Sequence, residues 1–99
     1  MTIERLVGLQ VIDEAGYQAY REHMTPILHA HGGGFGYDFR IAEVLRSATA
    51  APINRVFTIH FPDAAALDAF FSDPGYLAVR ATYYAPSVSH ATELARYER

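Results

Sequence analysis

The spacing of apolar and polar residues predicts four strands along the chain. The run Ile3–Ile12 is short, apolar and rich in β-branched residues, as is typical of a strand. Similar patterns predict strands over Phe35–Leu45, Asn54–Phe61 and Val88–Tyr97, with a loop at 46–52. The second and third strands therefore form a hairpin with a long loop.

Helical periodicity fills the two intervals between these strands. Asp13 can cap a first helix, Pro26 should kink it and Gly32–Gly34 should end it. A second helix begins after Pro62, restarts at Ser72–Pro74 and stops at Pro86. The first helix has one stripe, formed by Tyr17, Tyr20, Met24, Ile27, Leu28 and His31. The second has Leu67, Phe70 and Phe71 on one face, and its restarted part continues with Tyr76, Leu77, Arg80, Tyr83 and Tyr84.

The order of these elements, βαββαβ, predicts an α+β fold of the ferredoxin-like type. Right-handed crossovers give a four-stranded antiparallel sheet with the first and third strands at its centre and both helices on one face. The opposite face, which also carries apolar residues, then needs cover. We therefore expect a homodimer that pairs through this face of the sheet.

Length and charge limit the possible classes of protein. The 99 residues suffice for one core, so we expect a single domain over 1–99. A net charge of −3 without a basic run argues against nucleic acid and anionic membranes as partners. An acidic residue near the start and the lack of a long apolar stretch suggest a cytoplasmic protein. The absence of cysteine excludes disulfides and thiolate chemistry, and thirteen aromatic residues favour a pocket or an interface.

Symmetric pairing of the hairpin about its loop places opposite charges side by side. Asp38 then lies opposite His60, Arg40 opposite Thr58, and Glu43 opposite Arg55. Alternation of side chains assigns Tyr37, Phe39, Ile41, Phe57, Ile59 and Phe61 to the helix-covered face, and Asp38, Arg40, Ala42, Val56, Thr58 and His60 to the other. The second set is too polar for a dry core.

Several segments together carry a family resemblance that spans nearly the whole chain. They are Tyr17–Tyr20, Pro26, Gly32–Gly33, Glu43–Leu45, Arg55–Pro62 and Phe71–Tyr76. The chain resembles the domain-of-unknown-function-1330 family of the dimeric α+β barrel superfamily. The resemblance implies a homodimer whose two sheets face each other as a barrel with the helices outside. Relatives in the superfamily include cofactor-independent monooxygenases, isomerases, haem-binding enzymes and proteins without known activity.

The predicted polar face offers a candidate catalytic group. His60 has the chemistry of a general base, Asp38 would orient its imidazole, and Arg40 would stabilise an oxyanion. The alternative is a cross-strand pair that only satisfies polar groups in a dimer interface. Both interpretations depend on the predicted register.

Further residues complete the candidate substrate site. Thr58 lies on the polar face, and Gln10 joins it if the odd-numbered residues of the first strand face the helices. His90 joins this face from the last strand if it points there together with Val88, Thr92 and Leu94. The opposite phase, with Ser89, Ala91, Glu93 and Ala95 on this face, is equally plausible. Tyr17 is the helix residue that we assign to the pocket.

Metal and phosphate sites have weaker support. His29 and His31 are two residues apart on a helix and point in different directions, and His23 lacks further ligands at a suitable spacing. The glycine run 32–36 follows a helix and lacks the third glycine of a dinucleotide motif, so it is better explained as a helix stop. We expect neither a metal nor a cofactor.

These observations lead to one functional hypothesis and one rival. The hypothesis is a homodimeric small-molecule-binding protein, whose pocket lies between sheet and helices or inside the barrel. If it is an enzyme, it acts without a cofactor by abstracting a proton next to a carbonyl, as an isomerase or monooxygenase does. The rival is a non-catalytic module whose polar sheet face specifies the dimer interface.

Overall fold

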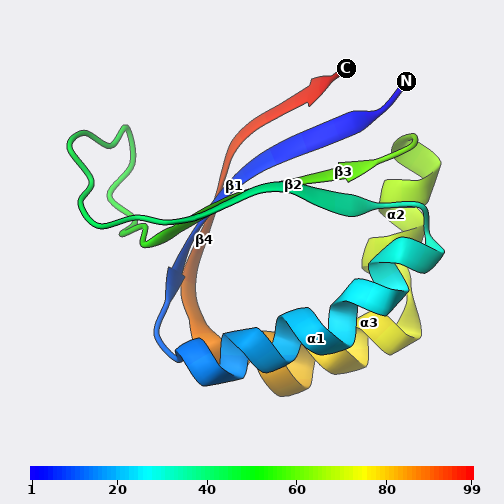
Figure 1. The fold of residues 1–99 in the computed structure, drawn as a ribbon, viewed down its shortest axis with the longest axis horizontal. Helices are drawn as coiled ribbons and strands as arrows, with labels where there is room; N and C mark the ends of the chain where they lie inside the picture. Colours follow the sequence, from blue (N-terminus) through cyan, green and yellow to red (C-terminus); the bar gives the residue numbers. More distant parts are fainter.

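The sheet forms one layer and the helices form a second layer on one of its faces (Figure 1). The computed structural model describes residues 1–99. The sheet is antiparallel with the order β2-β3-β1-β4, so β1 and β3 are central as predicted. Its strands are β1 (Ile3–Val11), β2 (Gly34–Arg40), β3 (Arg55–Phe61) and β4 (Val88–Glu98). The predicted ferredoxin-like arrangement is confirmed.

The helical layer begins with α1 (Glu14–Ala30), which crosses between β1 and β2. After β3 the chain forms α2 (Ala64–Ser72), α3 (Pro74–Val79), the π-helix η1 (Arg80–Tyr84) and the short α4 (Ala85–Ser87). No helix combines the length and apolar character needed to cross a bilayer.

Aspartate side chains start three of these helices. Asp13 accepts a hydrogen bond from the Gly16 N–H, and Asp63 accepts one from the Ala66 N–H. Asp73 does the same for α3, in front of Pro74 at the first helical position. These caps satisfy backbone donors that would otherwise lack partners, which explains why the chain enters each helix at that point.

The core lies between the layers and matches the predicted set. Phe57, Ile59 and Phe61 of β3 are between 0% and 8% exposed, so the predicted face of this strand is correct. They form one cluster with Tyr20, Met24, Leu67 and Phe70, against which Ile27 packs. The α-helical periodicity and the alternation in β3 therefore predicted the interior correctly.

The predicted register of the hairpin is wrong. Asp38 pairs with Phe57, Arg40 pairs with Arg55, and Gly34 is the residue opposite His60. The cause is a bulge between Phe35 and Asp38, where the Thr58 hydroxyl accepts a hydrogen bond from the Tyr37 N–H at 2.8 Å. A bulge inserts an unpaired residue and so reverses the side-chain alternation beyond it.

The bulge exchanges the two faces of β2. Asp38 and Arg40 lie on the helix-covered side, which we had predicted for Tyr37 and Phe39. These two aromatic rings instead stack on each other and are 67% and 51% exposed. The predicted Asp38–His60 and Arg40–Thr58 pairs therefore do not form.

The second strand is also shorter than predicted and ends at Arg40. Beyond it, Asn54 accepts a hydrogen bond from the Ile41 N–H and connects the hairpin to β1. Its side-chain amide exchanges two hydrogen bonds of 2.8 Å with the backbone N–H and C=O of Val11. Residues 41–54 consequently form a loop that projects from the sheet (Figure 1). Glu43 lies in this loop, so its predicted pairing with Arg55 is wrong as well.

Candidate functional site

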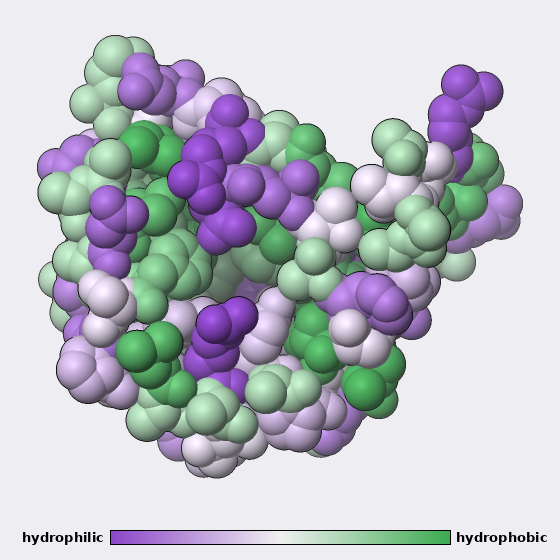
Figure 2. All heavy atoms as spheres, turned by 180° about the vertical axis from the view of Figure 1, so that it is seen from behind, coloured by the Kyte–Doolittle hydropathy of each residue, from purple (hydrophilic) through white to green (hydrophobic).

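A cavity of about 520 Å³ lies between the sheet and the helices. Its volume falls within the roughly 300–1,000 Å³ of typical small-molecule sites. Thirteen of its nineteen lining residues are hydrophobic. Figure 2 shows a hollow with hydrophobic residues inside and hydrophilic residues around it. The apolar lining includes Val7, Leu9, Met24, Phe35, Phe57, Ile59, Phe70 and Phe71.

Tyrosines from α1, α3 and η1 supply the neutral polar groups of this cavity. The hydroxyls of Tyr20 and Tyr76 lie 2.9 Å apart, and both residues are at least 95% buried. Burial raises the pKa of these two phenols and also the pKa of Tyr17 and Tyr84. All four hydroxyls are therefore protonated at neutral pH and can donate hydrogen bonds.

Charged residues gather at the end of the cavity formed by β1, β4 and η1. Glu93 Oε1 accepts hydrogen bonds from Arg5 Nε at 2.9 Å and from Arg96 Nε at 2.7 Å. Arg5 also lies over the Phe71 ring, and Arg80 lies over the Tyr84 ring. Three guanidinium groups thus accompany a single carboxylate, which makes this end of the cavity positive.

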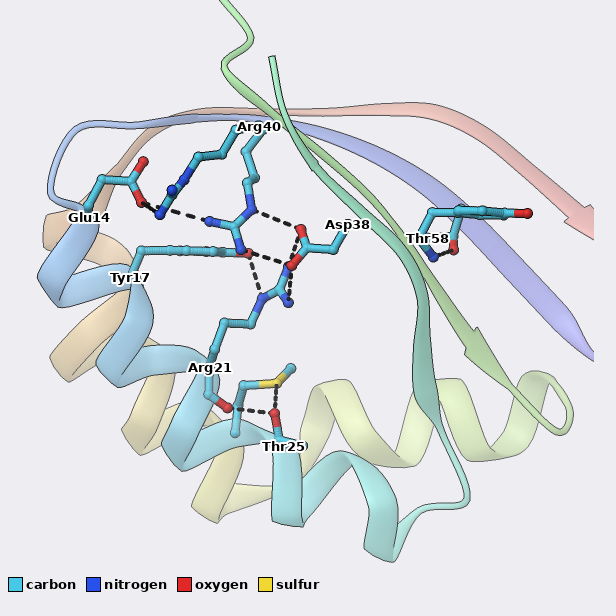
Figure 3. A network of polar contacts seen from close by, with 10 residues as sticks. Glu14, Tyr17, Arg21, Thr25, Asp38, Arg40 and Thr58 are labelled. Carbon is cyan, nitrogen blue, oxygen red and sulfur yellow. Dashed lines mark hydrogen bonds and ion pairs between the residues drawn. The ribbon is translucent and has the colours of Figure 1, made fainter. Parts of the chain in front are cut away.

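A second charged cluster lies where α1 meets β2 and β3 (Figure 3). Arg55 donates two hydrogen bonds of 2.8 Å to the carboxylate of Asp38, in the bidentate geometry that favours arginine. Arg21 donates to the same carboxylate at 3.2 Å and to the Tyr17 hydroxyl at 2.8 Å. Its guanidinium also covers the Phe35 ring at 3.9 Å. The cluster fixes Tyr17 and Arg21 at the cavity wall.

The Asp38 cluster predicts a pH-dependent component of stability. Burial disfavours the charged form of Asp38, but hydrogen bonds and charge from Arg55 and Arg21 outweigh burial, so the pKa of the carboxyl is lowered from 3.8. The stability gained from this shift is present above the unfolded-state pKa and is lost as pH falls through the folded-state pKa. We expect Asp38→Asn to remove this component in urea unfolding at pH 7 and pH 3.

A control and a contradicting result complete this test. Glu43→Gln changes the charge equally on the exposed loop, so it should retain the dependence of the parent protein. If Asp38→Asn and the parent lose equal stability between the two pH values, the Asp38 cluster does not stabilise the fold.

The predicted site residues divide among three places. Tyr17 lines the cavity. Asp38 forms an ion pair with Arg21, which lies beside the cavity (Figure 3). The side chain of Arg40 is 78% exposed and lies 3.8 Å from Glu14, near the start of α1. His60 lies on the opposite face of the sheet. The proposed base, its orienter and the oxyanion-binding arginine therefore do not meet.

The remaining predicted residues lie on the open face of the sheet. Thr58 is buried there and uses its hydroxyl to support the bulge. Gln10 and His90 lie directly opposite each other on β1 and β4. However, Glu4 is the β1 residue that pairs with His60, and Gln10 lies six residues further along, about 20 Å at 3.3 Å per residue. These residues do not form one site.

The histidines of α1 also separate. The His23 ring stacks on Tyr83, and His31 Nε2 lies 2.9 Å from Asp73. No group of three His, Asp or Glu side chains is arranged to hold a metal ion.

Five charged residues that line the cavity were not among the predicted site residues: Arg5, Arg21, Arg80, Glu93 and Arg96. Arg5 has a sequence signal, because it shares the core-facing phase of Val7 and Leu9, where a charged side chain is unusual. Glu93 and Arg96 depend on the alternation of β4, which the pattern left open. Arg80 shares the helical spacing of Tyr76 and Tyr84, and it lies on a π-helix, a kind of segment that often occurs at functional sites.

The fold and this site define a ferredoxin-like α+β domain with a cavity between its sheet and its helices. Comparison with protein families then identifies the chain more closely. The model of the family "Domain of unknown function (DUF1330)" matches residues 6–94, so the chain belongs to this family. The predicted family resemblance is confirmed.

Solved structures confirm the fold. A protein of unknown function from Rhodopseudomonas palustris has a TM-score of 0.83 at 18% identity, with 99% of this chain and 82% of that chain covered. A dimeric ferredoxin-like protein of unknown function from Jannaschia has a TM-score of 0.57 at 19% identity, with both chains covered fully. SnoaB, a cofactor-independent oxygenase from Streptomyces nogalater, has a TM-score of 0.59 at 14% identity, covering 99% of this chain and 90% of that one. Curated proteins give no significant match.

Proposed function

We propose that the protein binds a small, largely apolar molecule in the cavity between sheet and helices, and that it does so as a homodimer. The single observation that supports binding is the cavity itself, which combines a hydrophobic lining with a few convergent polar groups. This combination is typical of ligand sites. A packed core without a ligand role would leave far less empty volume, since unfilled space costs stability.

The titratable groups of the cavity favour binding over proton abstraction. The hydrogen bond from Arg96, together with that from Arg5, lowers the pKa of Glu93, which makes its carboxylate a weak base. The phenols are neutral, and no histidine lines the cavity. The similarity to the oxygenase SnoaB therefore supports our proposal through the fold alone, and it identifies no reacting side chain in this protein. Proton abstraction in this cavity would need a substrate that loses its proton without a basic side chain of the protein.

A fluorescence titration tests the binding proposal. N-phenyl-1-naphthylamine is neutral and aromatic, and its emission rises in apolar surroundings. We expect saturable binding of about one probe per chain, because each chain has its own cavity. A linear response without saturation would contradict the proposal.

The open face of the sheet supports the homodimer. The exposed fractions of Tyr37, Phe39, Leu94 and Tyr97 there lie between 41% and 67%, and no helix covers them. Exposed apolar patches of this kind often mark interfaces. The same face carries His60, Gln10 and His90, so the polar groups that we predicted for a site are available to specify the interface. The structural similarity to a dimeric protein from Jannaschia is consistent with this assembly.

Light scattering should therefore report about twice the chain mass at micromolar concentration. Phe39→Asp places a charge on the open face and should shift the protein towards the monomer, since an unpaired buried charge is costly. Leu77→Asp is the matched control, because Leu77 is exposed on α3, on the helical side of the molecule. A parent protein that stays monomeric would contradict the dimer.

A further inference from the structure

Arg80 differs from the other arginines of the cavity in its pairing. Arg5 and Arg96 share Glu93, and Arg21 is paired with Asp38. Arg80 lines the cavity without a carboxylate within ion-pair distance. Its guanidinium carbon instead lies 5.5 Å from the centroid of the Tyr84 ring. The cavity thus contains one cation whose charge has no counterion within the protein.

The neighbouring arginines also retain free donors. Each binds Glu93 through Nε, and their terminal NH₂ groups make no hydrogen bond within the protein. Terminal guanidinium donors of this kind suit a planar anion such as a carboxylate. Glu93 therefore holds Arg5 and Arg96 in place without neutralising all of the positive charge at this end of the cavity.

The buried tyrosines contribute a further free donor. The hydroxyls of Tyr20 and Tyr76 share one hydrogen bond, which uses only one of their two O–H protons. The second proton has no acceptor among the protein groups. Both residues are at least 95% buried, so an acceptor oxygen that enters the cavity would satisfy a donor that is otherwise costly to leave unpaired.

Aromatic rings surround these donors. The Tyr84 ring centroid lies 5.0 Å from that of Tyr20, and Phe71 lies beneath Arg5. Such rings favour stacked or edge-to-face contacts with another aromatic group. The cavity therefore offers an aromatic wall, a phenolic donor and an uncompensated cation to one ligand.

We propose that the ligand of the cavity is an aromatic carboxylate, whose anionic group is bound by Arg80 with the terminal donors of Arg5 and Arg96, and whose ring packs against Tyr84 and Phe71. This inference rests on the proposed function, because it names the chemical class of ligand for the same cavity. A hydroxyl or carbonyl oxygen on the ring would accept the free proton of the Tyr20–Tyr76 pair.

Two matched probes separate the charge from the ring. 2-Naphthoate is ionised at pH 7, whereas 2-naphthamide has the same ring system and no charge. Isothermal titration should show that the parent protein binds naphthoate about tenfold or more tightly than naphthamide, as expected for charge-assisted hydrogen bonds. Arg80→Gln should reduce this preference severalfold. Arg46→Gln removes the same charge from the exposed loop and should retain the parent's preference.

The possible results distinguish this inference from the proposed function. Equal affinity of the parent for naphthoate and naphthamide, together with saturable binding of the neutral fluorescent probe, would overturn the carboxylate ligand and leave the binding cavity intact. A preference for naphthoate that survives in Arg80→Gln would overturn the assignment of Arg80. If neither naphthalene nor the neutral probe binds, the proposed function itself is wrong.

Discussion

Phe61→Ala is expected to lower the free energy of unfolding by about 3–5 kcal/mol, the range for deleting a buried phenylalanine. Phe61 is completely buried, and its ring lies 5.6 Å and 5.8 Å from the rings of Phe70 and Phe71. Small domains are stable by only about 5–15 kcal/mol, so the loss would remove a large part of the total. Urea unfolding measured by circular dichroism gives the difference directly.

Phe57→Ala provides the matched comparison, because Phe57 lies on the same face of the same strand. Its ring lines the cavity, whereas Phe61 is surrounded by protein. Truncation at Phe57 enlarges space that is already empty and breaks fewer contacts, so we expect a smaller loss than at Phe61. A loss below about 1 kcal/mol at Phe61 would contradict the assigned core, since surface substitutions have effects of that size.

The interior of the fold was predictable because its elements follow regular periods. Phe57, Ile59 and Phe61 alternate without interruption, and the apolar residues of α1 recur at helical spacing, so both faces followed from the pattern. The aspartate caps were equally predictable, since Asp63 and Asp73 directly precede helices whose first N–H groups need hydrogen-bond acceptors. Local chemistry and packing agree at these positions.

The register of β2 was not predictable from alternation alone, because a single bulge reverses every later side chain. Gly36 nevertheless offers a signal. A Cβ atom there would come within 2.5 Å of the Thr58 hydroxyl, so only glycine allows the close approach at the bulge. An isolated glycine in a strand is typical of such a site. The prediction paired the hairpin symmetrically and so placed no bulge at Gly36. The predicted Asp38–His60 site depended on that symmetric pairing.

The candidate site was predictable only in part for a similar reason. The position of Tyr17 was predictable from the helical spacing of apolar residues in α1. The charged end of the cavity instead depends on which residues of β4 face the helices. There the pairing with β1 shifts between Leu6 and Val7, so Glu93 and Arg96 lie on the cavity side although they are three residues apart. Strict alternation cannot place both residues on one face. Only the three-dimensional arrangement brings them to Arg5.

Ala91→Trp is expected to weaken binding of the neutral aromatic probe by about tenfold or more, equivalent to about 1.4 kcal/mol or more. Ala91 lies on β4 directly opposite Leu9, a core residue, and it lines the cavity. Residues opposite each other in an antiparallel pair share a face, so the indole would project into the space that the probe needs. β4 is an edge strand, which allows the larger side chain to be accommodated without displacing the central strands.

Ala78→Trp is the control for this variant, because Ala78 is exposed on α3 and does not line the cavity. It adds the same indole to the surface and should bind the probe like the parent protein. Urea unfolding of both variants shows whether they remain folded. The comparison therefore reports on the volume of the cavity and not on tryptophan itself.

The titration of the parent, Ala91→Trp and Ala78→Trp with N-phenyl-1-naphthylamine is the most direct test of the binding cavity. We expect saturable binding of about one probe per chain for the parent and Ala78→Trp, and binding weakened about tenfold or more for a folded Ala91→Trp. Equal affinity of all three folded proteins would place the probe elsewhere and contradict a ligand site between the sheet and the helices.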